Sequence, residues 1–556
     1  MKKKILWILC PHLASVCLGA CEGPEVSETE VSSESADHIV PGHTQETGTE
    51  EGGTMKPAPE TFPAEREGKE DMPVVLSLVS DSQYDHVWED GRRLCYVSYS
   101  RVRLDDQEED SGTGAKAFPQ LARALEEINV QVADDARESL ERLEVQARGL
   151  AADGFSGELS WENQSWVVRA DSQVTSVLGE GSTYLGGAHG MYWYGAITFD
   201  SQTGRKLELE EVVTDPNRLA ELAAERLGEK YSDVEFFESV TDVVTEEAEK
   251  GDLTWTAGYE GITLYFDPYE LAPYSYGALT VTILYEEQPG LFSEKIRQVP
   301  DSWAVPLAPG LEFDLGQDKS LDTVRVSGVS GLGSGYEKLR VLVNGQESLT
   351  DMWFYSYTPY VVRAAGLDTE LLVAETTSDN DYEVIWVYEL DPAREGFYTP
   401  WQFSGTGFFS YYREKDDGDI EYGTHVFTNP EHFHLRAHMD LLSTYYGHRW
   451  YGIGETASRA EGYLVPEQSW YDVDRGDNPL TLLVPLDMEL EDTRELREFP
   501  AGTKLWIVRV EGNYVGFVTE DGTRCQVYVE PGWPERVRGK EDMEAGDIFD
   551  GMMFAG

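Results

Sequence analysis

The sequence predicts an α+β domain over residues 73–308, followed by an all-β domain over residues 310–556. After residue 117, apolar residues recur at three- and four-residue steps, which is the period of an amphipathic helix that packs on a sheet. The second half of the chain instead shows short alternating runs that turn dipeptides separate, which is typical of strands. A length of 556 residues also favours two folded domains once a leader and a linker are set aside.

The first residues predict export. Lys2, Lys3 and Lys4 form a positive start, and the apolar run behind them is too short to span a bilayer as a mature helix. Leu-Gly-Ala before Cys21 resembles the lipobox of bacterial lipoproteins. The resemblance implies a signal peptide at residues 1–20, a lipid on Cys21 and an extracytoplasmic protein anchored to the cell membrane. An ordinary secretory signal that contains cysteine is the alternative.

Residues 21–72 predict a disordered acidic tether, because they are rich in Glu, Ser, Thr, Gly and Pro and nearly free of apolar side chains. Such a chain reaches roughly 40 Å. Removing the three lysines of residues 1–20 would leave 41 of the 44 basic residues against 103 acidic ones, a net charge of −62. This balance excludes nucleic acid as a partner and favours basic ones, although solubility alone also explains much of it.

Cysteine usage excludes a disulfide framework. Cys10 and Cys17 belong to the predicted signal peptide, and Cys21 is the predicted lipid site. Cys95 and Cys525 remain, far apart in the sequence and in separate predicted domains. Two lone cysteines also cannot form a zinc site by themselves.

A glycine-rich segment with a single histidine lies at residues 186–190, Gly-Gly-Ala-His-Gly. It suits a catalytic loop, a partner-binding surface or a bend between two strands. Catalysis needs several groups that act together, and no nucleophile in a fixed motif or second metal ligand accompanies His189. We therefore expect Gly186 and Gly187 to supply unusual backbone angles and His189 to satisfy buried backbone groups at the bend, with a partner surface as the alternative.

Two segments together resemble a known family. The first is the glycine-rich segment with the aromatic strand and turn that follow it, up to residue 212. The second matches the pattern Phe-x-Pro-Tyr-x-x-x-Pro-x-x-x-Gly at Phe266, Pro268, Tyr269, Pro273 and Gly277. In this order, behind the long helix, they resemble the lysozyme-binding extracellular domain of RsiV-type anti-sigma factors over residues 73–308. The same domain pair precedes the catalytic domain of PdaC-type peptidoglycan deacetylases.

The resemblance implies a non-catalytic ectodomain, with lysozyme as one expected partner. Signalling as in the RsiV type is not carried over, because the chain offers no transmembrane helix to cut and no cytoplasmic sigma-binding segment. The stretch Ile-Thr-Phe-Asp-Ser at residues 197–201 lacks the second Asp and the Gly of the deacetylase motif, so deacetylation there is rejected. Tyr269 and Tyr274 crowd a proline-broken bend, where they either present a binding surface or pack at the rim of the core.

In the second domain the strand-like runs leave the choice between a propeller-like fold and a sandwich open, and the final hairpins resemble a small SH3-like barrel. His432, His434 and His438 would share one strand face, but His438 lies too far along a strand to join the others on one metal ion. Residues 472–477 and 379–381 could hold calcium, and ordinary Asx turns explain both. The aromatic runs near residues 353 and 408 suit either sugar stacking or core burial.

The sequence therefore predicts a membrane-anchored lipoprotein that binds or senses a ligand at the cell envelope and is not an enzyme. The predicted partners are lysozyme or another basic envelope protein, or peptidoglycan, and no cofactor or metal is expected. The predicted binding residues are Gly186, Gly187, His189, Tyr269 and Tyr274. A cell-wall hydrolase or deacetylase with an unrecognised site, and a structural spacer, are the alternatives.

Overall fold

Strands dominate the part of the chain that the structure describes. The computed structural model describes residues 72–106, 112–331, 335–379, 382–393, 396–397, 399–414, 420–454, 462–476, 478–530 and 532–554. From Met72 onward the chain forms one compact unit. The predicted signal peptide, Cys21 and the tether lie outside the described residues.

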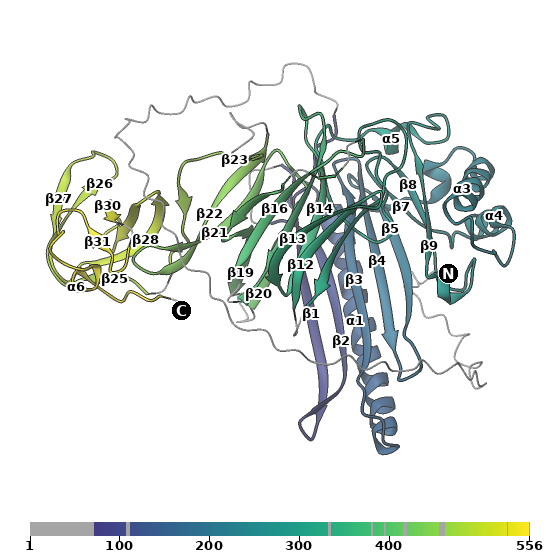
Figure 1. Ribbon diagram of the computed structural model, residues 1–556, viewed down its shortest axis with the longest axis horizontal. Coiled ribbons are helices and arrows are strands. Elements are labelled where there is room, and N and C mark those ends of the chain that lie inside the picture. Colours follow the sequence, from purple (N-terminus) through teal and green to yellow (C-terminus); the bar gives the residue numbers. More distant parts are fainter. Residues whose placement is uncertain are drawn as a thin grey trace, which may run out of the picture. The chain divides into compact units, whose positions relative to one another are not determined.

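One eight-stranded sheet holds most of the first half of the chain (Figure 1). All its neighbouring strands are antiparallel except for the parallel pair β2–β3. In order across the sheet, its strands are β19 (Ser410–Glu414), β20 (Ile420–Val426), β1 (Leu78–Glu89), β2 (Arg92–Leu104), β3 (Leu159–Ala170), β4 (Val174–Tyr184), β5 (Met191–Asp200) and β6 (Arg205–Lys206).

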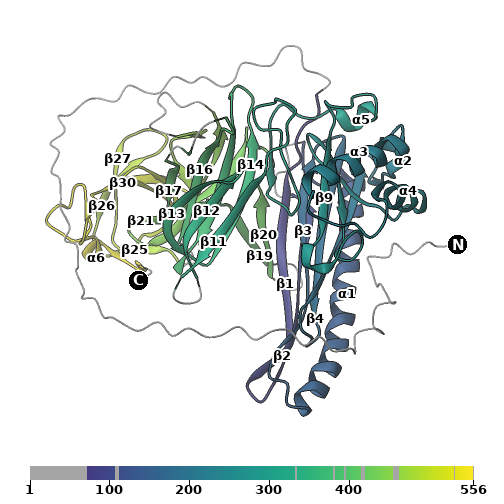
Figure 2. The same cartoon turned by 45° about the vertical axis from the view of Figure 1, so that its right-hand side comes forward.

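The long helix α1 (Pro119–Ala152) carries the apolar stripe that the residue spacing predicts. Pro119 suits the first helical turn, where a backbone N–H has no partner within the helix. The helix runs along the sheet in both views (Figures 1 and 2). Its Ala136, Leu143 and Ala147 form one buried cluster with Cys95 of β2, so the stripe covers one face of the sheet.

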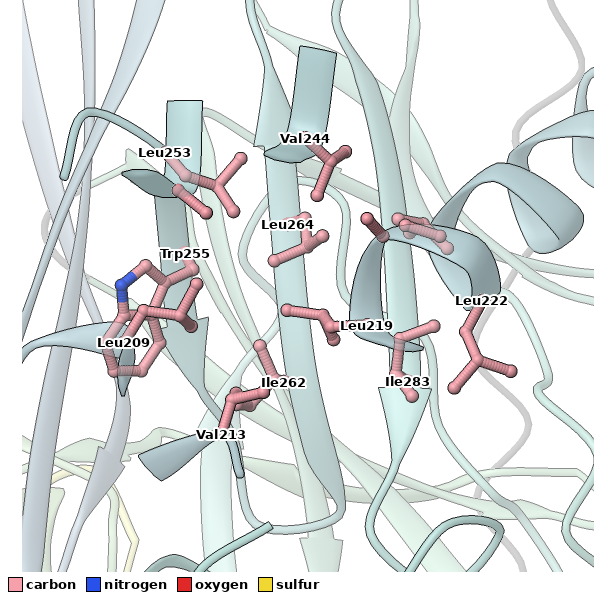
Figure 3. Close-up of a cluster of buried hydrophobic side chains, with 14 of the residues drawn as sticks. Leu209, Val213, Leu219, Leu222, Val244, Leu253, Trp255, Ile262, Leu264 and Ile283 are labelled. Carbon is pink, nitrogen blue, oxygen red and sulfur yellow. The ribbon is translucent and has the colours of Figure 1, made fainter. Parts of the chain in front are cut away.

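A smaller α/β layer follows in the chain. Helices α3 (Pro216–Lys230) and α4 (Val240–Lys250) pack on the three-stranded sheet β7 (Thr254–Ala257), β8 (Gly261–Phe266) and β9 (Leu279–Leu284). Figure 3 shows Leu219 of α3 and Val244 of α4 beside Leu264 of β8, within the buried cluster that also includes Trp255 of β7. Asp215 caps the start of α3, because its side chain accepts a hydrogen bond from the Arg218 N–H at 3.1 Å. The short helices of this half are α2 (Leu209–Val212), the 3-10 turn η1 (Tyr274–Tyr276) and α5 (Glu294–Arg297).

The second half of the chain is β-rich and spreads over three further sheets. One pairs β10 (Trp303–Pro306), β14 (Ser356–Arg363), β15 (Glu370–Thr377), β16 (Glu383–Leu390) and β17 (Trp401–Ser404) in this order, and another pairs β11 (Val324–Ser330), β12 (Tyr336–Val343) and β13 (Gln346–Phe354). The largest runs through β18 (Thr406–Phe408), β21 (Phe433–Asp440), β22 (Thr444–Ile453), β24 (Tyr471–Asp472), β28 (Lys504–Glu511), β29 (Tyr514–Thr519), β30 (Arg524–Glu530), β26 (Leu486–Leu490) and β27 (Leu496–Phe499). Attached to it are β23 (Leu464–Pro466), β25 (Leu480–Leu482), β31 (Arg536–Val537) and β32 (Phe549–Asp550), and the short helix α6 (Ala545–Ile548) precedes β32.

The two predicted domains share a core. One buried cluster joins Leu178 of β4 to Val341 and Trp386 of β12 and β16. Strand β20 pairs with β1, and the guanidinium of Arg363 bridges Glu260 and Glu370 at 2.6 and 2.8 Å. The division near residue 309 stays a prediction, and packing across it is extensive.

The fold is thus β-rich with several sheets, and the strand pairing closes none of the described sheets on itself. The propeller, sandwich and SH3-like interpretations are finer than this and stay predictions. Cys95 and Cys525 are buried free thiols. No helix in the described ranges has both the length and the apolar character needed to cross a membrane.

Candidate functional site

The two sequence segments of the resemblance meet at one exposed surface. The loop between β4 and β5 brings the His189 ring onto the Tyr274 ring, with centroids 4.2 Å apart and planes 25° from parallel. The Tyr274 hydroxyl donates a hydrogen bond to the Gly190 carbonyl at 2.7 Å, and the Tyr269 ring lies 5.5 Å from the Tyr274 ring. We call His189, Tyr269 and Tyr274 the aromatic surface.

The glycines have unequal roles in this loop. Gly186 has a φ of +87°, and a Cβ there would lie 2.9 Å from Cδ1 of Leu150, so both its backbone angle and its space favour glycine. Gly187 is exposed, and its carbonyl accepts a hydrogen bond from the Tyr184 hydroxyl at 3.0 Å. The predicted bend is therefore confirmed at Gly186.

His189 is exposed, and it contacts the backbone of the bend, as the sequence predicts, only at a neighbouring residue. Nδ1 lies 2.9 Å from the carbonyl oxygen of the neighbouring Gly190, so the contact to the backbone is local. The short Gly-Gly-Ala stretch before it projects the loop beyond the ends of β4 and β5, where solvent reaches the ring. The loop is thus a bend between two strands that also leaves the His189 ring accessible to solvent.

Tyr269 is held in an unusual conformation. Its φ is +75°, a region that side chains other than glycine, Asn and Asp rarely adopt, and its N–H donates to the Ala272 carbonyl at 3.1 Å. Nevertheless 48% of the residue is exposed, so burial of the ring does not explain the strain. Strained backbone of this kind concentrates at binding sites, where the surrounding structure enforces it.

Carboxylates border the aromatic surface. The Asp267 carboxylate accepts a hydrogen bond from the Tyr194 N–H at 2.8 Å, and burial raises its pKa to about 6 although that bond opposes the shift. Glu270 is exposed, and its carboxylate accepts a hydrogen bond from the Asp267 N–H at 2.8 Å. Loss of solvent around the Glu270 carboxylate raises its pKa to about 7, although the hydrogen bond from the Asp267 N–H opposes the shift. Burial likewise raises the pKa of Glu180 on β4.

This arrangement offers stacked rings, hydroxyls and carboxylates to a partner. Rings attract cations and apolar groups, and carboxylates pair with Lys and Arg. The aromatic surface holds one imidazole beside two phenols, which provides neither a nucleophile with its base nor a set of metal ligands. Across the described ranges, no group of three or more His, Cys, Asp or Glu side chains could hold a metal ion.

The histidine run of the second half divides into two environments. His432 and His434 both stack on Trp450, at 4.0 and 4.3 Å between ring centroids, whereas His438 lies beside Tyr446 at 5.8 Å. His434 is buried, and its pKa is lowered to about 2, first by burial and then by the nearby histidines. The three side chains therefore do not converge on one ion.

Sequence reasoning missed the partners of His434. His448 of β22 brings its Nδ1 to 2.9 Å from Nε2 of His434, and the His425 ring of β20 lies 6.1 Å away. Phe409 contacts all three rings. Five of the ten histidines of the chain lie at residues 425–448, a local excess that is visible in the sequence.

The acidic turns point their side chains at protein groups. Asp472 accepts a hydrogen bond from Gln468 at 2.9 Å, and Asp474 lies 3.4 Å from Nε2 of His448. Asp379 accepts a hydrogen bond from the Tyr355 hydroxyl. Residues 380, 381 and 477 lie outside the described residues.

Comparison with known proteins finds a family match for one segment of the chain. Residues 211–286 match a family described as a protein of unknown function, DUF3298. Similar solved structures include a member of this family from Bacteroides fragilis, 17% identical, which covers 40% of this chain and 96% of its own at a TM-score of 0.30. A DUF3298 family protein from Pseudomonas aeruginosa is also 17% identical and covers 41% of this chain and 98% of its own, at a TM-score of 0.25. No curated protein matches the chain.

Proposed function

We propose that this protein is a non-catalytic binding module of the bacterial cell envelope that captures lysozyme or another basic envelope protein. The lipid on Cys21 and the acidic tether would hold it outside the cell membrane. One observation carries the proposal: two segments about 80 residues apart in the sequence build a single exposed aromatic surface. These are the same segments that carry the resemblance to the RsiV-type ectodomain.

The chemistry of this surface suits a basic protein. Tyr269 and Tyr274 offer large, stiff rings, and such rings dominate the energy of many protein interfaces. Lysine and arginine side chains stack on phenol rings and pair with carboxylates such as those of Asp267 and Glu270. The net charge of −59 adds long-range attraction, which accelerates encounter with a basic partner.

Calorimetry with hen lysozyme tests the proposal. Residues 22–556 would be titrated at low and at physiological salt. We expect submicromolar affinity at both, because packed aromatic contacts resist screening whereas attraction between exposed charges does not. Binding that disappears at physiological salt would reduce the interaction to attraction by net charge and would overturn the proposal.

A pair of variants assigns the contact. Tyr269→Ala removes an exposed ring from the aromatic surface and should weaken binding about tenfold to a hundredfold, in the range of interface hot spots. Tyr382→Ala is the matched control, since Tyr382 is a similarly exposed tyrosine outside the aromatic surface. Equal affinity in both variants would place lysozyme elsewhere on the protein.

A further inference from the structure

An open sheet face extends away from the aromatic surface. Side chains alternate across a sheet, so helix α1 covers the face that includes Cys95 and Leu159, and the next residues along each strand point to the opposite face. Strand register then identifies the residues that share this opposite face. It bears Tyr96 on β2, Ser160 on β3 and Tyr184 on β4.

Two rows of side chains cross this face. Paired neighbours run from Tyr84 through Ser98, Glu162 and Ser182 to Tyr192. Five strands take part, so the row is roughly 20 Å long at the usual spacing between strands. The serines are small, and tyrosines stand at both ends.

The second row starts at the β1–β2 hairpin, where rings cluster. It runs from His86 through Tyr96 and Ser160 to Tyr184. The His86 ring lies 5.3 Å from the Tyr84 ring and 5.8 Å from the Trp88 ring. Tyr84 and Trp88 are 49% and 55% exposed, and both rings adjoin the His86 ring between them.

The face joins the aromatic surface at its other end. The Tyr192 ring lies 6.3 Å from the Tyr274 ring, and the Tyr192 hydroxyl accepts a hydrogen bond from the Ala278 N–H at 2.7 Å. Tyr274 in turn stacks on His189. A partner that covers the aromatic surface therefore meets the open sheet face without a gap.

Charge indicates what kind of partner this face accepts. Glu162 accepts a hydrogen bond from the Tyr96 hydroxyl at 2.7 Å, and Glu180 lies two residues from Ser182 along β4, paired with Gln164. Within the described ranges, neither forms an ion pair with a basic side chain. The nearby Arg93 is engaged, because it pairs with Glu158 at 2.6 Å, donates a hydrogen bond to the Tyr84 hydroxyl and lies over the Tyr84 and Tyr96 rings. The face therefore combines unpaired carboxylates with rings that attract cations.

We propose that the partner bound at the aromatic surface also lies across this open sheet face as far as Tyr84 and Trp88, and that it does so with a surface rich in lysine and arginine. The inference rests on the proposed function and enlarges its contact area. Specific interfaces bury about 800 Å² on each partner, which three loop residues alone do not supply. The two rows add the remaining area.

A double variant at the hairpin tests this extension. Tyr84→Ser/Trp88→Ser should weaken binding of hen lysozyme tenfold or more. Trp353→Ser/Tyr355→Ser is the matched control, because it removes another exposed Trp–Tyr pair, on and beside β13. Its affinity should stay within twofold of wild type. If the hairpin variant binds as tightly as the control while Tyr269→Ala still weakens binding, the extension is overturned and the proposed function stands.

Two further measurements keep the outcome clear. Glu162→Gln changes the charge with little change of shape, so it should slow association and reduce its salt dependence. If the hairpin variant unfolds, this variant tests the extended contact instead, and an unchanged association rate overturns it. Lysozyme with acetylated lysines should bind at least tenfold more weakly than native lysozyme. Equal binding of both forms overturns the cationic partner. A wild-type protein that fails to bind lysozyme at physiological salt overturns the proposed function and this inference together.

Discussion

Two regions of the molecule each stack a histidine ring on another aromatic ring, one at the surface and the other in the interior. His189 stacks on Tyr274 at the surface, and His434 stacks on Trp450 in the interior. Both imidazoles lie within 4.3 Å of an aromatic ring, so the contact itself does not separate them. Exposure separates them. The His189 ring is available to a partner, whereas the His434 ring fixes the packing of β20, β21 and β22.

The cause of the difference is local. Glycines before His189 turn the chain away from the sheet, so the ring has solvent on one side. His434 stands within β21, where period-two alternation directs it onto His448 of β22 and onto Phe409, which lies between β18 and β19. Substitutions at the buried site should therefore change stability, and substitutions at the exposed site should change binding.

The largest expected effect is that of His434→Ala. The change removes a buried ring between Trp450 and Phe409 and deprives His448 of its hydrogen-bond partner. We expect the free energy of unfolding to fall by about 2–4 kcal/mol, as for other large-to-small changes in a core. Urea denaturation at pH 7 measures it.

His438→Ala is the control, because His438 lies on the same strand and is only half-buried. It should cost less than about 1 kcal/mol. Equal losses in the two variants would show that position on β21, and not burial, decides the effect.

Acidification should have the next largest effect. The pKa of His434 is about 2 in the folded protein and near 6.5 in the unfolded chain, so the unfolded chain binds more protons between these values. The stability that this site contributes is complete above pH 6.5 and is lost as the pH falls. At pH 5 the loss is about 2 kcal/mol. Denaturation curves at pH 7 and pH 5 measure it.

Other charged groups around His434 modulate this loss. His425 also has a lowered pKa because of burial, and the carboxylate of Asp105 opposes the shift. Asp474 faces His448, and Glu467 pairs with His432. His434→Phe keeps a ring but cannot titrate, so it should lose less stability than wild type between pH 7 and pH 5. Identical pH profiles would remove His434 as the cause.

The residue pattern predicted those structural features that depend only on residues close together in the sequence. The apolar stripe of α1 was visible because helix period is local, and its Leu121, Leu125, Val132 and Leu143 are all buried. The turn at Gly186 was visible for the same reason. The contact between His189 and Tyr274 was not, because it depends on how β5 lies against the loop after β8, and no local rule states that.

The histidine cluster shows the same limit. Alternation placed His432, His434 and His438 on one face, but the partners of His434 come from neighbouring strands. Strand β20 pairs with β1, more than 300 residues earlier in the chain, and short runs of sequence do not encode such pairings. Sequence therefore indicated which residues to examine and could not indicate which of them meet.

A smaller effect separates the two glycines of the exposed region. Gly186→Ala forces a side chain into a positive φ and against Leu150, so it should lower the free energy of unfolding by about 1 kcal/mol. Gly187→Ala meets only the His189 carbonyl oxygen, 3.9 Å away, and should change it by less than about 0.5 kcal/mol. Thermal denaturation of both variants compares them. Equal costs would mean that the bend does not depend on the backbone angle of Gly186.

The smallest expected effect is the coupling between His189 and Tyr274. A double-mutant cycle of His189→Ala and Tyr274→Ala should give a coupling energy of about 0.5 kcal/mol in stability, because an exposed ring pair retains much of its solvent. The same cycle between His189 and Tyr276 should give none, since among the described residues the His189 ring stacks on Tyr274 and the Tyr276 hydroxyl donates to the Asp233 carbonyl instead. A coupling above about 1.5 kcal/mol would mean that the His189–Tyr274 stack stabilises the fold as the buried His434 stack does. The contrast between the two regions would then fail, and the aromatic surface would be part of the structural framework before it is a place for a partner.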